Sequence, residues 1–171
     1  SLEERNWVNN KTTLTSPAGT VASFAGVSEA TVLDGFTIKG PEVPPSGWGA
    51  LRHYGISNKN GSPRISNCTI IGNYNYGIYN ENGSPRITNC TISDNGAAYG
   101  FRNEGGNPTF TNCILWGNGN NSFYTYRGTS IFSYSDIEGS GGSEDWVTSK
   151  GTDGGNNIDS DPWFVLSIPS S

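Results

Sequence analysis

Short apolar runs alternate with polar residues along most of this chain, and the pattern returns every 22 or 23 residues. The segment from Gly61 to Phe101, GSPRISNCTIIGNYNYGIYNENGSPRITNCTISDNGAAYGF, carries nearly the same motifs twice. Two residue series follow the same intervals of 22 and then 23 residues: Pro63, Pro85 and Pro108, and Cys68, Cys90 and Cys113. A period of this length is typical of solenoids, propellers and other repeat arrays.

The pattern inside one repeat chooses among these architectures. The runs YGIYN, SPRITN and CTIS are short, rich in β-branched or aromatic residues and separated by Gly, Asn or Pro, which predicts strands rather than helices. Three strands in one repeat fit one rung of a parallel β-helix, in which each strand pairs with its copy about 4.8 Å away. We therefore predict an all-β fold, a single-stranded parallel β-helix (solenoid) of about five to six rungs with 22–23 residues and three short strands each.

Alternate residues of the strands predict the inward columns of side chains. One column is Phe36, Cys68, Cys90, Cys113 and Ser135, and a second is Ile38, Ile70, Ile92, Leu115 and Ile137. The preceding strand contributes Ile65, Ile87, Phe110 and Phe132, and another contributes Ile56, Ile78, Phe101 and either Phe123 or Tyr124. No single rung could bury its apolar side alone, so the stacked columns form the core.

Departures from the period predict the domain organisation. We expect one β-helix domain over residues 1–171 with core rungs at 31–139, as part of a longer protein. Ile38 and Ile70 are 32 residues apart, so an inserted loop is expected near 41–53, with His53 as a surface residue at its edge. Residues 140–157 are expected to form a long flexible loop, and residues 158–165 a closing segment.

Asn67, Asn89 and Asn112 precede the Cys column and predict a ladder of amides along the axis. Such a ladder satisfies polar groups at a tight corner. Two of these residues begin glycosylation sequons, Asn67-Cys-Thr and Asn89-Cys-Thr, which are discounted on the expectation that the corners are buried.

Composition narrows the class of protein. The 24 glycines suit a fold with many tight turns, and 12% aromatic with only 15% charged residues is not a disordered composition. The net charge of -5 argues against nucleic acid and anionic membranes as partners, and no apolar run is long enough for a membrane span. The three cysteines lie one repeat apart, which predicts buried thiols and no metal site.

At this point the sequence resembles a known group. The stretches GSPRITNCTISDN, YGIYNENGSP, VLDGFTIKG and NIDSDPWFV, within Thr31 to Val165, resemble right-handed parallel β-helix repeats of the pectin-lyase-like superfamily, of the Asn-Cys-Thr-Ile type found in secreted or surface bacterial proteins. The resemblance implies a right-handed helix and an extracellular or cell-surface location. It does not imply one activity, because the characteristic motifs of pectate lyases and polygalacturonases are missing from this sequence.

The outer face of the Cys-bearing strand is the first place to look for chemistry, because such a face commonly holds the saccharide cleft in that superfamily. Asp136 and Glu138 lie on this outer face, two residues apart on one strand. Their Cβ atoms are therefore expected about 7 Å apart, near the lower limit of the carboxylate separation in inverting glycosidases. They are the candidate catalytic residues, although a solvated last strand would show the same pattern. Trp116, one rung earlier, is a candidate platform for a sugar ring.

Other outward residues are candidates for binding. Tyr79 could stack on a carbohydrate, and Arg64 and Arg86, one rung apart, could hold an acidic sugar. The late carboxylates could hold Ca²⁺, although their spacing matches no known loop motif: Glu144, Asp145, Asp153, Asp159 and Asp161. No other cofactor is expected. The column Thr37, Thr69 and Thr91 also leaves an ice-binding surface open, although the neighbouring column lacks threonine.

Together these observations favour a non-catalytic, extracellular β-helix module that binds a polysaccharide or cell-envelope glycan. The alternative is a polysaccharide-degrading enzyme, of the glycoside hydrolase or lyase type, acting on the face around Trp116, Asp136 and Glu138.

Overall fold

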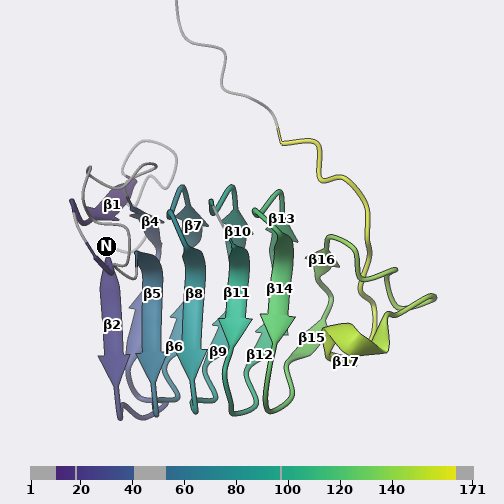
Figure 1. The fold of residues 1–171 in the computed structure, drawn as a ribbon, viewed down its shortest axis with the longest axis horizontal. Coiled ribbons are helices and arrows are strands. Elements are labelled where there is room, and N and C mark those ends of the chain that lie inside the picture. The colour runs from purple at the N-terminus through teal and green to yellow at the C-terminus, as the bar shows by residue number, and fades with distance from the viewer. Residues whose placement is uncertain (1–10, 18, 41–52, 97, 165–171) are drawn as a thin grey trace, which may run out of the picture.

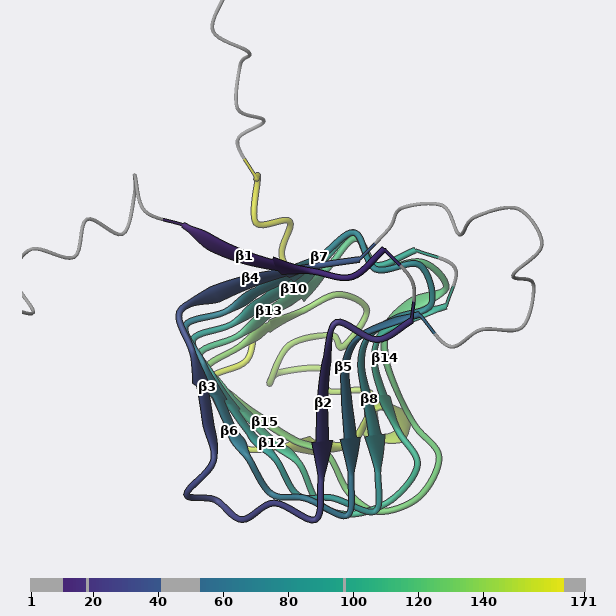
Figure 2. The same ribbon diagram turned by 90° about the vertical axis from the view of Figure 1, so that its left-hand side faces the viewer.

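The computed structural model describes residues 11–17, 19–40, 53–96 and 98–164, and the chain there winds as a parallel β-helix (Figure 1). Three parallel sheets run side by side along the axis and enclose the core (Figure 2). Sheet A consists of β1 (Thr12–Thr15), β4 (Phe36–Lys39), β7 (Thr69–Ile71), β10 (Thr91–Ser93), β13 (Ile114–Trp116) and β16 (Asp136–Ile137). Sheet B consists of β2 (Ala22–Ala25), β5 (Tyr54–Lys59), β8 (Tyr76–Glu81), β11 (Tyr99–Asn103) and β14 (Asn121–Thr125). Sheet C consists of β3 (Val32–Asp34), β6 (Arg64–Ser66), β9 (Arg86–Thr88), β12 (Thr109–Thr111), β15 (Ile131–Ser133) and β17 (Thr152–Asp153).

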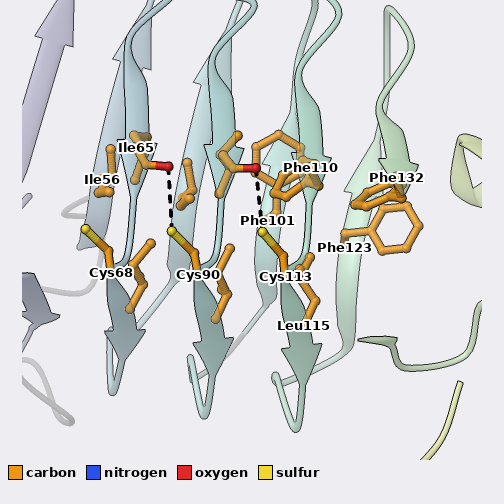
Figure 3. Packing of buried hydrophobic residues seen from close by; sticks show 14 of the residues in the cluster. Ile56, Ile65, Cys68, Cys90, Phe101, Phe110, Cys113, Leu115, Phe123 and Phe132 are labelled. Atoms are coloured by element: carbon orange, nitrogen blue, oxygen red, sulfur yellow. Dashed lines mark hydrogen bonds between the residues drawn. The ribbon is translucent and has the colours of Figure 1, made fainter. Parts of the chain in front are cut away.

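The register confirms the predicted columns. Ile70, Ile92 and Leu115 pair in register on β7, β10 and β13, and all three are buried. In the column of Ile56 the inward residue is Phe123, whereas Tyr124 faces outward in register with Arg102. Figure 3 shows the isoleucine, phenylalanine and cysteine side chains of successive rungs stacked over one another.

The three cysteines are free thiols in this core, as predicted. Cys90 and Cys113 each donate a hydrogen bond to a carbonyl oxygen of the neighbouring sheet C, that of Ile65 and of Ile87 (Figure 3). Burial raises the pKa of Cys113 to about 11.

The corner between sheets C and A carries the predicted asparagine ladder. The Nδ2 of Asn89 donates to Oδ1 of Asn67 at 3.1 Å, and the Nδ2 of Asn112 donates to Oδ1 of Asn89 at 2.8 Å. All three residues have φ between 52° and 54°, a left-handed conformation that Asn tolerates well. The expectation of buried corners is wrong: these side chains are exposed because the two-residue turn points them away from the core.

Two further asparagine ladders lie inside the helix. At the end of the sheet B strands, Asn58 donates to Asn80 and Asn80 donates to Asn103, each at 2.7 Å. At the corner between sheets A and B, Asn95 receives the amide of Asn73 and donates to Asn118 at 3.0 Å. Both ladders are buried, and each recurs at the 22- to 23-residue interval of the repeat.

The helix extends beyond the predicted core rungs at both ends. Strands β1 and β2 lie before residue 31 and complete a first rung together with β3, and Leu14 on β1 pairs in register with Ile38. Residues 41–52 of the predicted inserted loop lie outside the described residues. His53 is buried, not at the surface as predicted, because its Nδ1 accepts the amide of Gly19 at 3.0 Å and its ring meets Tyr74 edge-on.

The segment after residue 139 closes the end of the helix with more structure than the predicted flexible loop. It contains the 3-10 helix η2 (Thr148–Lys150) and β17, and Ile158 bridges to Asp136 in β16. Trp146 packs against Phe132 with ring centroids 6.0 Å apart and donates its Nε1 hydrogen to the carbonyl of Gly151. No helix in the described part of the chain is long and apolar enough to cross a membrane.

Candidate functional site

Five tyrosines gather on the outer side of sheet B. Offset stacks, with ring planes 18–27° apart and centroids 4.9–6.0 Å apart, link Tyr54, Tyr76, Tyr79, Tyr99 and Tyr124, here called the tyrosine stack. Tyr54, Tyr76 and Tyr99 occupy one register column, and Tyr79 and Tyr124 occupy a second on either side of Arg102. The stack therefore follows directly from the repeat, one or two rings in each rung.

A glycine after each first tyrosine lets the strand bend toward the core. At Gly77 an added Cβ would lie 2.6 Å from the carbonyl oxygen of Gly100 and 2.8 Å from the side-chain nitrogen of Asn95, so no larger residue fits. The recurring Tyr-Gly pair is thus a single structural unit. Its first residue supplies an outward ring and its second lets the backbone approach the inner asparagine ladder.

Arg102 lies in the middle of the tyrosine stack. Its guanidinium carbon is 5.6 Å from the centre of the Tyr76 ring and 5.5 Å from that of Tyr124, within reach of cation–π interaction. Nη1 donates to the Tyr76 hydroxyl at 3.2 Å, and an ion pair with Glu104 holds the other side of the guanidinium. These contacts fix both a positive and a negative group among the rings.

Beside Arg102 the surface forms a hollow of about 320 Å³, lined by Tyr54, Asn75, Tyr76, Tyr79, Arg102 and Glu104. Most ring faces are covered by the next ring, so a ligand here would meet hydroxyls, ring edges, the guanidinium and the carboxylate. Tyr124 at the end of the stack is 39% exposed and offers more of its ring. Such a mixture suits a ligand with many hydroxyl groups and some apolar C–H surface.

The ligand-binding residues predicted from the sequence lie on three different sheets. Trp116 is on sheet A, Tyr79 is on sheet B, and Arg64 and Arg86 are on sheet C. The two arginines pair in register, but both are engaged by Glu29: its carbonyl oxygen accepts from Nε of Arg64, and its carboxylate lies 3.9 Å from Arg86. Only Tyr79 belongs to the tyrosine stack.

Comparison with known proteins identifies the family. A family model described as "Right handed beta helix region" matches residues 11–139, most of the chain. This chain belongs to the right-handed β-helix family. The assignment agrees with the three parallel sheets and with the resemblance to the pectin-lyase-like superfamily. Searches of curated proteins and of solved structures returned no match.

The two candidate catalytic carboxylates of this β-helix each hold a neighbouring segment. Glu138 Oε2 accepts hydrogen bonds from the amide of Gly117 at 2.9 Å and from the Ser122 hydroxyl at 2.8 Å. Asp136 Oδ1 accepts the amide of Ser160 at 3.2 Å. Burial raises the pKa of Asp136, and the neighbouring carboxylates Asp159 and Asp161 act in the same direction.

The late carboxylates of the β-helix are spread over separate hydrogen-bond sets. Asp153 Oδ1 accepts from Ser143, Gly155 and Asn157, and the backbone amide of Gly155 is the main cause that lowers the pKa of Asp153. Asp159 accepts the amides of Gly139 and Gly141. Within the described ranges, no three His, Cys, Asp or Glu side chains come together as a metal site.

The outer face of sheet A has one column of threonines. Thr13 and Thr37 pair in register, and Thr69 and Thr91 continue the column along the axis. The adjacent column contains Thr15, Lys39, Ile71, Ser93 and Trp116. The regular array of hydroxyls is therefore a single row.

Repetition could have revealed most of the tyrosine stack from the sequence. Tyr54, Tyr76 and Tyr99 recur at the repeat interval, each followed by Gly. The sequence-based prediction of ligand-binding residues includes Tyr79 but none of these three. Arg102 carries no such mark, because it replaces a tyrosine in its column. Only the packing of neighbouring rungs shows that it lies between two rings.

Proposed function

We propose that this β-helix is a non-catalytic extracellular module that binds a polysaccharide or cell-envelope glycan on the tyrosine stack. The supporting observation is the cluster of five outward tyrosines around the Arg102–Glu104 pair, beside a hollow. Aromatic edges and faces pack against the C–H groups of a sugar, while phenol hydroxyls and fixed charges hydrogen-bond to its hydroxyls.

A rigid sheet suits this function because it presents its groups without a large ordering cost. The tyrosines rest on strands that pair on both sides in β5, β8 and β11, and Tyr54 is itself buried beneath its neighbours. Binding then needs little rearrangement of the protein, which favours affinity for a long, repetitive ligand.

Affinity measurements on soluble polysaccharides test the proposal. A panel of β-glucan, xylan, polygalacturonate and solubilised peptidoglycan would be titrated against the protein and against Tyr79→Ala. The matched control is Tyr126→Ala, because Tyr126 is 56% exposed and has no ring contact with the stack in the described part of the chain. We expect one polysaccharide to bind, Tyr79→Ala to weaken it roughly tenfold or more, and Tyr126→Ala to leave it unchanged.

The same panel examines the enzymatic alternative. New reducing ends or unsaturated products that disappear in both Asp136→Asn and Glu138→Gln would replace the binding module with a polysaccharide-degrading enzyme. Binding that is unaffected by Tyr79→Ala, with the fold intact by circular dichroism, would remove the tyrosine stack from the proposal.

A further inference from the structure

A second hollow lies at the corner between sheets C and A, near the closed end of the helix and on a different face from the tyrosine stack. Its volume is about 440 Å³. The residues that matter for its chemistry are Asn112, Ile114, Tyr134, Asp136, Asn156 and Ile158. Two isoleucines thus meet an aromatic ring, two amides and a carboxylate around one small space.

The exposed asparagine ladder ends at this hollow and has a direction. Asn67 donates to a carboxylate oxygen of Asp34, and Asn89 and Asn112 each donate to the asparagine of the rung before. Every amide nitrogen therefore points along the axis toward Asp34, and the carbonyl oxygens point toward the hollow. Hydrogen bonds in such a chain polarise one another, so the last oxygen, Oδ1 of Asn112, is a strengthened acceptor.

Tyr134 occupies the position where the ladder would continue. It has φ of 52°, matching Asn112 one rung earlier, although a tyrosine is strained in this left-handed conformation. It is 63% exposed, and among the described residues its side chain makes neither a ring contact nor a hydrogen bond. Tyr134 therefore lacks the ladder hydrogen bond and holds a strained backbone conformation, and no side-chain packing contact among the described residues compensates for these costs.

Asp136 makes the hollow electronegative. The residue is only 8% exposed, and its Oδ1 accepts the amide of Ser160, while Oδ2 has no hydrogen-bond partner within the described residues. Asp159 and Asp161 add negative charge nearby. An anionic ligand is disfavoured here, whereas a group carrying positive charge and N–H donors would be attracted.

We infer that this hollow binds an amino sugar, with its ammonium group between Asp136 and Asn112 and its ring against Tyr134. The inference rests on the proposed glycan-binding function. It adds that the bound glycan contains sugars with a positively charged amine. A protonated amine donates three hydrogen bonds, which Oδ2 of Asp136 and Oδ1 of Asn112 can accept. The sugar hydroxyls then meet the side-chain amide of Asn156, and the C–H face of the ring meets the tyrosine.

The polar and aromatic lining of the hollow favours a sugar over a lysine side chain of a protein partner. A lysine carries one polar group at the end of a thin apolar chain and would leave Asn156 and the Tyr134 hydroxyl without ligand partners. A hexosamine is broad, polar along its rim and apolar on its faces, like the groups that line this space.

Paired oligosaccharides test the inference directly. Glucosamine oligomers and N-acetylglucosamine oligomers of equal length share a backbone and differ in the charge of the amine, and both would be titrated under mildly acidic conditions at low salt. We expect the glucosamine oligomers to bind roughly tenfold more tightly, a preference that added salt reduces. Asp136→Asn should abolish the preference, and Tyr134→Asn, which restores the ladder residue without threatening the fold, should weaken glucosamine binding.

Three outcomes overturn the inference in distinguishable ways. Equal affinity for both oligomers would contradict the role of Asp136. Glucosamine binding that survives Tyr134→Asn but is lost in Tyr79→Ala would place the ligand on the tyrosine stack, so the proposed function would stand and this site would fall. Binding of polylysine that depends on Asp136, with no binding of either oligosaccharide, would assign the hollow to a protein partner and remove the glycan proposal from this corner.

Discussion

The middle rungs and the closing end of this β-helix use the same backbone path with different rules for side chains. From β7 to β13 the inward and corner columns each repeat one kind of residue: aliphatic over aliphatic, Cys over Cys and Asn over Asn. In the next rung Ser135 follows Cys113, Tyr134 follows Asn112, and Asp136 follows Ile114. The repeated residues thus determine the fold, whereas the residues that break the repeat lie at the end cap and line the candidate binding hollow there.

The difference arises because side chains in the two regions have different packing and hydrogen-bond partners along the axis. A middle rung has an identical neighbour on both sides, so identical side chains can pack and hydrogen-bond along the axis. The rung of β15 and β16 is followed only by a partial rung, made of β17 and the bridge at Ile158, and Trp146 packs on Phe132 at this end. Polar groups released from the ladders become available there for a ligand.

The largest effect is expected from a charge placed in the middle columns. Ile92→Asp puts a carboxylate between Ile70 and Leu115, where no partner can compensate it. We expect a loss of about 4 kcal/mol or more in unfolding free energy, enough to unfold the domain. Circular dichroism melting checks this, with Thr91→Asp as the neighbouring outward control. A cooperative melt near the wild-type temperature would contradict the inward assignment.

Much of this middle region was predictable from the sequence, because identical residues at a fixed interval leave one way to align the rungs. The four apolar columns, the free thiols and the ladder of Asn67, Asn89 and Asn112 follow from that alignment, whereas the exposure of this ladder does not. The first rung was missed because β1 and β2 lack the Asn-Cys-Thr-Ile motif, although Leu14 still packs in the Ile38 column. The buried position of His53 depends on Gly19, from a different rung, which no local pattern reveals.

The buried asparagine ladders should matter more than the exposed one. Asn95→Ala removes the side chain that accepts from Asn73 and donates to Asn118 and the Ile70 carbonyl, and it leaves these buried groups without partners. We expect a cost of about 3 kcal/mol. The matched variant is Asn89→Gly, which removes an exposed ladder amide while tolerating the positive φ, and should cost less than about 1 kcal/mol. Chemical denaturation of both variants measures the contrast, and equal costs would contradict it.

The end cap is expected to contribute a smaller, separable amount. Trp146→Ala removes the ring that covers Phe132 and the hydrogen bond to Gly151, and the expected cost is about 2 to 3 kcal/mol. Val147→Ala is the control, because that side chain is exposed. Hydrogen exchange should show faster opening of β15 and β16 in the tryptophan variant, with β7 and β8 protected as before. Uniform loss of protection along the helix would show that cap and middle unfold as one unit.

Alkaline pH should weaken the β-helix through the thiol of Cys113, whose pKa is raised by burial. The pKa of Cys113 is about 11 in the folded protein, against 9.0 for an unperturbed thiol, so the unfolded chain loses its proton first as pH rises. The stabilisation is complete below about pH 9 and is lost progressively toward pH 11, by up to about 3 kcal/mol. The difference in unfolding free energy between wild type and Cys113→Ala, measured across this pH range, isolates the contribution of this thiol. Parallel pH profiles for the two proteins would contradict the assignment.

The smallest expected change is a gain, and it joins the two regions. Tyr134→Asn places the ladder residue of the middle rungs into the end rung, relieves a tyrosine held at φ of 52° and offers a new donor to Oδ1 of Asn112. We expect about 1 kcal/mol of added stability, seen as a higher melting temperature. If residue 134 had only a structural role, Tyr134 would lower the stability of the repeat with no compensating benefit. If the variant melts at a higher temperature but binds glucosamine oligomers less tightly, Tyr134 lowers the stability of the fold and holds a ligand at the end of the ladder. If the variant melts at a lower temperature, Tyr134 instead stabilises the end cap.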